Sequence, residues 1–340
     1  MLPDGPSIAE EGFLLERKHL IALALTVVIV SSVAIIAVWY PTTQPDVRIG
    51  YLNQDLHQLA VRVALENGWF EEEGLNVQLL QFGNGAYEMD GFLGGQIDMG
   101  YLGAAPAMTK SINQDIGITV LAAVNLEGSA IMVHKGEYDA GRIANMSDLA
   151  GKTVYHPGPS TVQNFLLRLA LNQSGMSIED VALAQSRPQD MAISLTPSSP
   201  AFIAWEPFPA LAEYEDLAVP LLLSEEIWPR HPCCVVATSN SFLEAHPDRV
   251  QKVVDIHKRA EEWIVDNPLD ALAIAVDWLG ADEDAVETAF NRIIYDYNLN
   301  RTGLERYLEF LIHEELVDLD YGDMDAFLDG FINSTFIEST

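Results

Sequence analysis

The stretch that decides the fold runs from Gly94 to Met108 and reads GGQIDMGYLGAAPAM. Its composition predicts a short strand over residues 97–101, then a turn of glycine and alanine, then a helix opened by Pro106, since proline suits the first position of a helix. The first backbone N–H groups of a helix have no partner inside it, and a turn this poor in side chains would leave them facing outward. We therefore expect Ala104 and Ala105 to present these groups to an anion or a polar ligand head. A strand–helix connection that is packed for its own sake is the alternative.

The charge of the chain excludes one class of partner. The 340 residues include 50 acidic and 18 basic ones, for a net charge of −32, whereas nucleic-acid phosphates require a basic surface. Hydrophobic residues make up 49% of the chain, which is enough for two medium-sized lobes with their own cores. We expect a folded, monomeric protein that does not bind nucleic acid.

One apolar run predicts a membrane segment. Residues 20–39 carry no charge and match the length of a helix that crosses a bilayer. A basic cluster at 17–19 precedes the run and no basic residue follows it in 41–46, so the positive-inside rule places residues 1–19 in the cytoplasm and the rest outside. We predict a single-pass anchor at 20–40 and a stalk at 41–45. A cleavable signal peptide is the alternative, but no Ala-x-Ala site follows directly.

Strand and helix patterns alternate along the remaining chain. Strands are predicted at 47–52, near 75–80, and at 97–101, 119–124, 130–134, 181–185 and 201–205, with mostly helical segments at 247–265, 268–279, 284–294, 304–311 and 324–331. Such alternation is typical of parallel sheets covered by helices. A second α/β unit begins near residue 137 and ends near 228. Two units that face each other would bring strand ends to one cleft, where hinge closure on a small molecule is the natural mechanism.

Motifs of enzymes and metal sites are missing from the sequence. It contains no Gly-x-Ser-x-Gly elbow, no His-Glu-x-x-His and no phosphate-loop lysine motif, and the pair Gly83-x-Gly85 lacks the third glycine of a dinucleotide fingerprint. The adjacent Cys233 and Cys234 are interpreted as small apolar residues, because sequence neighbours rarely bridge without strain and no further cysteine or Cys/His pair stands at ligand spacing. We therefore predict no metal, no cofactor and no catalysis.

Six short motifs follow one another along the chain: RIGY at 48–51, ALENGWFEEEGL at 64–75, GQIDMG at 95–100, DLAGK at 148–152, AWEP at 204–207 and AHPD at 245–248. Each is weak alone. In this order and spacing, over roughly residues 46–270, they resemble the solute-binding proteins of ABC importers. The group that they resemble takes nitrate, sulfonates, taurine, bicarbonate and thiamine pyrimidine precursors.

The resemblance implies an α/β fold of two lobes, the type II periplasmic-binding fold. It implies that the chain crosses twice between the lobes, which we place at 130–135 and 233–238, as two strands lying side by side in a hinge. Lobe one would then comprise 46–136 and 229–340, and lobe two 137–228. The implied function is an extracytoplasmic receptor that captures a small polar solute, such as a sulfonate, a nitrate- or bicarbonate-like anion or a pyrimidine-type compound, and delivers it to an ABC permease and its ATPase.

Two departures from the family pattern leave other readings open. Residues 194–202 stand where the family commonly has a small Gly-x-Asp-Ala motif. A eukaryotic branch that makes thiamine pyrimidine carries a cysteine-rich metal motif, of which only Cys233-Cys234 is present here, and this argues against that enzyme. An enzyme of that type on the same fold and the ligand-sensing head of a receptor complex remain the alternatives.

Polar residues near the predicted cleft are the candidates for solute binding. His57 and Gln58 follow the first strand, where His57 is either a donor to a ligand oxygen or an exposed group at the start of a helix. Ser160 and Thr161 open a helix over residues 162–172 and either donate to an anionic head or act as caps alone.

Two further pairs complete the prediction. Trp205 and Glu206 end a strand, and an aromatic ring beside a carboxylate suits an organic cation or a ring better than nitrate, unless Glu206 serves a hinge or packing hydrogen bond. Asn125 and Glu127 lie near the first crossing. Glu127 would disfavour a simple inorganic anion by like-charge repulsion, whereas the Asn125 amide suits either charge.

Overall fold

The computed structural model describes residues 44–338, of which the part from Pro45 onward forms one compact unit. The predicted cytoplasmic segment 1–19, the anchor 20–40 and most of the stalk 41–45 lie outside the described residues. Within residues 44–338, no helix combines the length and the apolar character that crossing a bilayer would require.

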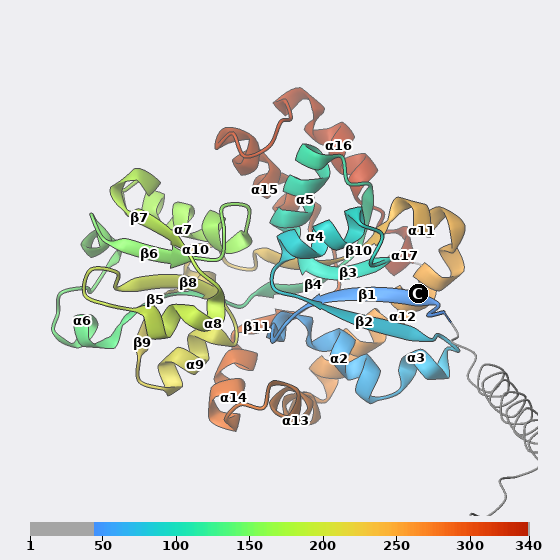
Figure 1. The fold of residues 1–340 in the computed structure, drawn as a ribbon, viewed down its shortest axis with the longest axis horizontal. Coiled ribbons are helices and arrows are strands. Elements are labelled where there is room, and N and C mark those ends of the chain that lie inside the picture. The colour runs from blue at the N-terminus through green and yellow to red at the C-terminus, as the bar shows by residue number, and fades with distance from the viewer. Residues whose placement is uncertain (1–43, 339–340) are drawn as a thin grey trace, which may run out of the picture. The chain divides into compact units, whose positions relative to one another are not determined.

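The first sheet has six strands in the order β11-β4-β10-β3-β1-β2 (Figure 1). The strands are β1 (Val47–Leu52), β2 (Val77–Phe82), β3 (Met99–Gly103), β4 (Ile118–Glu127), β10 (Pro232–Ser239) and β11 (Ile293–Tyr295). Strands β2, β1 and β3 are parallel, whereas β10 runs antiparallel to β3 and β4, and β11 antiparallel to β4. Every residue of β4 is buried, as expected for a central strand that helices cover on both faces.

Helices pack on both faces of this sheet, with α4 and α5 on one side and α2 and α12 on the other (Figure 1). Those that belong to this half are α2 (Leu59–Glu66), α3 (Trp69–Glu72), α4 (Gly85–Leu93), α5 (Ala104–Gln114), α11 (Asn240–Ala245), α12 (Pro247–Asp266), α13 (Pro268–Leu279), α14 (Glu283–Asn291), α15 (Arg301–His313), α16 (Met324–Phe331) and α17 (Thr335–Glu338).

The second sheet has five strands in the order β7-β6-β8-β5-β9. They are β5 (Ser129–His134), β6 (Thr153–His156), β7 (Ala182–Gln185), β8 (Ala201–Trp205) and β9 (Ala218–Leu223), accompanied by the helices α6 (Lys135–Asp139), α7 (Val162–Gln173), α8 (Pro188–Met191), α9 (Phe208–Tyr214) and α10 (Ser224–Ile227). Strand β8 lies in the middle and is buried throughout. Its alternate side chains enter two cores: Ile203 joins the large core shared with the first sheet, and Phe202 joins a smaller core on the opposite face.

The decisive stretch differs from its prediction at both ends of the strand, which begins at Met99 and not at residue 97. Strand β3 continues through Gly103 and α5 begins directly at Ala104, so Pro106 is the third helical residue and no separate turn exists. The reason is the neighbouring strand, because β10 pairs with β3 up to Cys234 opposite Gly103. Pairing with a partner from far along the chain therefore extends the strand beyond what its own composition indicates.

The predicted hinge is wrong. Strands β5 and β10 do not lie side by side: β5 pairs with β8 and β9 in the second sheet, and β10 pairs with β3 and β4 in the first. The connections just outside these strands are the parts that meet. The backbone N–H of Glu127 donates to His231 O at 3.1 Å, and that of Arg230 donates to Glu127 Oε1 at 2.6 Å.

The expected lobe boundaries need one adjustment. Because β5 pairs within the second sheet, residues 129–134 belong with that sheet, although the range 46–136 assigned them to lobe one. The start of lobe two at 137 is therefore too late, whereas its end at 228 and the range 229–340 for the rest of lobe one stay predictions. The helix predicted at 284–294 is also shorter, since the chain leaves α14 after Asn291 and forms β11 against β4.

A histidine under the first sheet is held in its neutral form. His257 of α12 is fully buried, and its Nε2 donates to Ala123 O of β4 at 2.7 Å. Burial lowers the pKa of His257 to about 4. The groups that face it are the Tyr101 ring and Glu261, whose Oε1 lies 3.9 Å from His257 Nδ1. Burial raises the pKa of Glu261 well above its ordinary value, so burial favours the uncharged form of both members of the pair.

We expect His257→Gln to make stability less sensitive to acid. The unfolded chain protonates this histidine near pH 6.5 but the native chain only near pH 4, so its contribution is present above pH 6.5 and is lost as the pH falls toward 4. Integrated, the loss between pH 7 and pH 5 is about 2 kcal/mol. Urea unfolding at both pH values measures this loss of stability. Glu261 acts with the opposite sign, so Glu261→Gln should enlarge the loss of stability in acid. Equal pH dependence of stability in wild type and His257→Gln would refute the assignment.

Candidate functional site

A cavity takes residues from both sheets. The first half contributes Leu52 at the end of β1, Asp55 and His57 just after it, and Cys233 and Cys234 of β10. From the second half comes Trp205 at the end of β8. The empty space among these residues, which includes open solvent at its mouth, is about 340 Å³.

Three helices direct their N-termini to this cavity. The remaining lining residues are Asn84 and Gly85 at the start of α4, Gly103 and Pro106 at the start of α5, and Thr161, Val162 and Gln163 at the start of α7. The N-terminal end of a helix carries a partial positive charge and unpaired N–H groups, and therefore favours oxygen-rich ligand heads. No lysine or arginine is among the lining residues, so the positive groups at the cavity are these helix ends and His57.

Glycine allows two of these helix ends to approach each other. A Cβ atom on Gly85 would lie 2.7 Å from Pro106 Cγ, and one on Gly103 would lie 3.2 Å from Pro106 Cδ. At this helix end the cavity is lined by Gly103 and Pro106, and of these two only Gly103 has a backbone N–H, since proline has none. Ala104 and Ala105, which we predicted, are buried and do not line the cavity.

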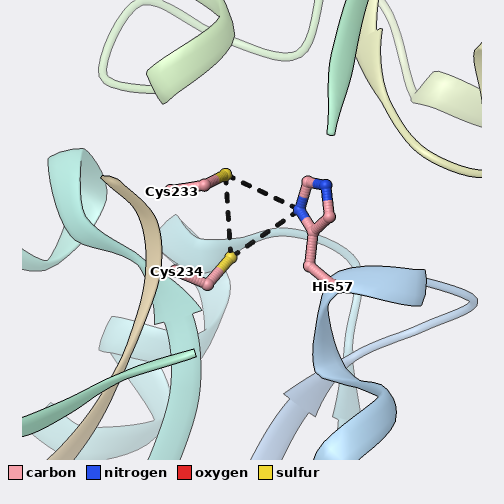
Figure 2. A group of neighbouring side chains, drawn as sticks. All are labelled: His57, Cys233 and Cys234. Atoms are coloured by element: carbon pink, nitrogen blue, oxygen red, sulfur yellow. Dashed lines mark hydrogen bonds between the residues drawn. The ribbon is translucent and has the colours of Figure 1, made fainter. Parts of the chain in front are cut away.

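One wall of the cavity holds a buried polar cluster (Figure 2). His57 Nε2 donates to Gly128 O at 2.7 Å, which turns Nδ1 toward Cys233 Sγ at 3.6 Å and Cys234 Sγ at 3.9 Å. Asp55 Oδ1 lies 3.4 Å from the same Nδ1 and also accepts from the His57 backbone N–H at 3.0 Å. The aspartate thereby fixes the short 3-10 helix at Leu56–Gln58 that carries the histidine.

The electrostatics of this cluster favour a charged pair. A hydrogen bond from Cys234 and the facing His57 outweigh burial and lower the pKa of Cys233 well below its usual range. Burial lowers the pKa of His57, but the negative Cys233 and Asp55 outweigh burial and raise it to about 9. Burial raises the pKa of Asp55 to about 7. Both shifts favour transfer of the Cys233 proton to His57, and both side chains are nearly inaccessible to bulk water.

Trp205 combines an apolar surface with a free donor. Its side chain is 5% exposed, and within residues 44–338 its indole N–H has no hydrogen-bond acceptor. Buried donors without a partner are rare and call for an explanation, such as a ligand or an ordered water. Trp205, His57 and Thr161 are the predicted residues that line the cavity.

Glu206, also predicted, has another role. It is completely buried, and its Oε1 accepts from Arg292 Nη1 at 3.1 Å while its Oε2 accepts from the Ala210 backbone N–H at 3.0 Å. Arg292 Nη2 also contacts Glu213 Oε2 at 2.5 Å. Glu206 therefore holds the two halves together and does not line the cavity, which matches the packing alternative considered from the sequence.

The other predicted residues do not line the cavity, and most of them hydrogen-bond to the backbone near it. Gln58 Oε1 accepts from the Leu52 backbone N–H at 2.6 Å. Asn125 Oδ1 accepts from the Cys234 N–H at 3.2 Å, and its Nδ2 donates to Glu127 O at 3.2 Å. Glu127 is occupied by the Arg230 N–H. Ser160 is half-buried at the loop before α7, where Thr161 is the residue that caps the helix by accepting from the Asn164 N–H at 3.3 Å.

Sequence reasoning missed Asp55, Asn84, Gly103, Gln163 and the cysteine pair as lining residues. Asn84 followed by Gly85 is a helix-cap signal that was visible in the sequence. For the cysteines no local signal existed, because the histidine that they meet is 176 positions away from Cys233. The absence of a further cysteine or Cys/His pair at ligand spacing holds along the chain, but in space His57 lies beside both cysteines.

The NMT1-like family model matches residues 41–280, a span that includes both sheets except β11. The chain belongs to the NMT1-like family. This confirms the resemblance drawn from the six motifs.

Two curated relatives are named for binding. A Brucella abortus (strain 2308) protein, named as a candidate binding protein, is 25% identical over 278 residues, 81% of this chain and 82% of its own length. A Bacillus subtilis (strain 168) protein, named as a candidate aliphatic-sulfonate-binding protein, is 26% identical over 263 residues, 74% of this chain and 76% of its own length.

A solved structure confirms the fold. The periplasmic nitrate-binding protein NrtA from Synechocystis PCC 6803 superposes with a TM-score of 0.77 at 14% identity, covering 87% of this chain and 89% of that one. This NMT1-like protein therefore has the two-lobed α/β periplasmic-binding fold.

Proposed function

We propose that this chain is the extracytoplasmic solute-binding component of an ABC importer, which closes its lobes on a small polar solute and delivers it to a permease and its ATPase. The observation that carries the proposal is the cavity between the two sheets, toward which α4, α5 and α7 direct their N-termini. Relatives named for binding aliphatic sulfonates and nitrate support the same class of function. The predicted anchor at 20–40 would keep the receptor near its permease and raise its effective concentration there.

The chemistry of the cavity favours a solute with an oxygen-rich head and an apolar or flat remainder. Helix N-termini suit the oxygens, and the Trp205 indole offers both a ring face and an unused N–H. Because no lysine or arginine lines the cavity and the carboxyl of Asp55 does, a head with a single or delocalised charge is favoured over a multiply charged one.

The direct test is a thermal-shift screen of the full chain with nitrate, bicarbonate, alkanesulfonates, taurine and pyrimidines. A solute that binds only the folded, closed form stabilises that form by mass action and so raises the melting temperature. At 100 times its Kd the stabilisation is about 2.7 kcal/mol. No shift with any of these solutes at millimolar concentration would contradict the proposed solute classes.

The enzymatic alternative has a test of its own. Loss of turnover on substituting His57, with affinity for the solute retained, would support that alternative.

We expect Trp205→Phe to weaken solute binding by a factor of about 2 to 12. The phenylalanine keeps an aromatic face but removes the indole N–H, and a hydrogen bond of this kind contributes about 0.5–1.5 kcal/mol. Isothermal titration with whichever solute shifts the melting temperature measures the effect. Trp278→Phe is the matched control, since Trp278 packs on Tyr51 away from the cavity. Equal affinities of the two variants would exclude Trp205 as a solute donor.

A further inference from the structure

Two adjacent cysteines point their sulfur atoms to the same side, which a regular strand would not allow. Successive side chains of a strand alternate between faces, but the register of β10 against β4 is irregular on both sides of Cys234. Asn125 holds this bulge through its bond to the Cys234 N–H. Figure 2 shows the result: both sulfurs face the Nδ1 atom of His57. Bulges that redirect side chains are frequent beside functional sites.

The separations of the three atoms fit a tetrahedral metal. With Zn–S near 2.3 Å and Zn–N near 2.05 Å, tetrahedral angles place two sulfurs about 3.8 Å apart and a sulfur about 3.6 Å from a nitrogen. The observed separations are 4.0 Å between the sulfurs, and 3.6 and 3.9 Å from the sulfurs to Nδ1. A cation could thus be accommodated after side-chain shifts of a few tenths of an ångström.

The surroundings also suit a metal ligand set. Metal-bound histidines usually donate their second ring N–H to a carbonyl or carboxylate, which fixes the ring, and His57 Nε2 donates to Gly128 O. The three side chains are almost fully buried, yet all line the cavity. A metal bound by them would keep its fourth position open toward the space where a solute or water can enter.

From this geometry we propose that His57, Cys233 and Cys234 form a binding site for one thiophilic cation, for which Zn²⁺ is the probe. Two sulfurs and one imidazole select Zn²⁺ or Cu⁺ over the hard cations Mg²⁺ and Ca²⁺, which prefer oxygen ligands. The site shares its cavity with the proposed solute, but the metal is tested alone, so failure of Zn²⁺ to bind would leave solute capture by the helix N-termini to be tested separately.

The test uses the full chain, reduced and stripped with a chelator. We expect uptake of one Zn²⁺ per chain, measured by elemental analysis after gel filtration, and a thiolate-to-metal charge-transfer band when Co²⁺ replaces Zn²⁺. Mg²⁺ and Ca²⁺ should not compete. Absence of stoichiometric Zn²⁺ in the wild type, or a Co²⁺ complex without the thiolate band, would overturn the proposal.

Variants assign the ligands. Competition with a chromophoric chelator should give a Kd for Zn²⁺ that is roughly 100-fold weaker or more in Cys233→Ser, Cys234→Ser and His57→Gln. His246→Gln is the matched control, since His246 is exposed and outside the cluster, and should bind like the wild type. The double variant Cys233→Val/Cys234→Val keeps the apolar volume, so it should melt like the chelated wild type and lose only the rise in melting temperature on adding Zn²⁺. Retention of that rise in the double variant would refute the site.

Discussion

Replacing Arg292 with methionine is expected to lower the free energy of unfolding by about 3–5 kcal/mol, because it leaves a buried carboxylate without its counter-charge. Arg292 lies just before β11 in the first half of the molecule, and it joins Glu206 and Glu213 of the second half. Glu206 is completely inaccessible. Burial raises the pKa of Glu206, while Arg292 and the Ala210 N–H oppose that rise. Urea unfolding at neutral pH measures the loss.

Two further variants serve as controls for Arg292→Met. The double variant Arg292→Met/Glu206→Gln removes both charges and should recover much of the loss, since the cost comes mainly from the unpaired carboxylate. Arg187→Met breaks an exposed pair with Asp190, in which the arginine side chain is 73% accessible, and should cost less than about 1 kcal/mol. If Arg292→Met is as mild as Arg187→Met, the pair does not hold the two halves together.

The sequence predicts elements well where local pattern decides them. Strand β8 and the helices α13 and α16 form within the predicted limits, because each has an apolar pattern bounded by proline, glycine or polar residues. Thr161 likewise caps α7 as predicted, since capping depends on neighbours two or three positions away.

Long-range pairing accounts for what the sequence does not predict. The extension of β3 to Gly103 and the short strand β11 depend on partners in β10 and β4. The same holds for the site. Glu206 belongs to a signature motif in the sequence, but only the fold shows that its carboxylate accepts a hydrogen bond from Arg292, 86 residues away. A local pattern can identify a polar residue near a cleft, but it does not reveal whether another part of the chain already satisfies that residue.

Gly128→Ala should be the most damaging single-methyl change at the cavity. Gly128 has φ +81°, and a Cβ atom there would lie 2.2 Å from His57 Nε2 and 2.8 Å from Ile293 Cγ1. The left-handed backbone alone costs a non-glycine residue about 1–2 kcal/mol, and overpacking of a rigid core adds about 1–3 kcal/mol. We therefore expect a loss of roughly 3–4 kcal/mol in the free energy of unfolding.

A second glycine separates the two contributions. Gly141 has φ +67° and no atom within 4 Å of its would-be Cβ, so Gly141→Ala reports the backbone cost alone, about 1–2 kcal/mol. The excess in Gly128→Ala then measures contact with His57 and Ile293. Because Gly128 O also orients the His57 ring, that variant alone should lose affinity at the cavity. Equal destabilisation of the two variants would mean that the chain relaxes around Gly128. It would also mean that His57 is not held against the connection between β4 and β5.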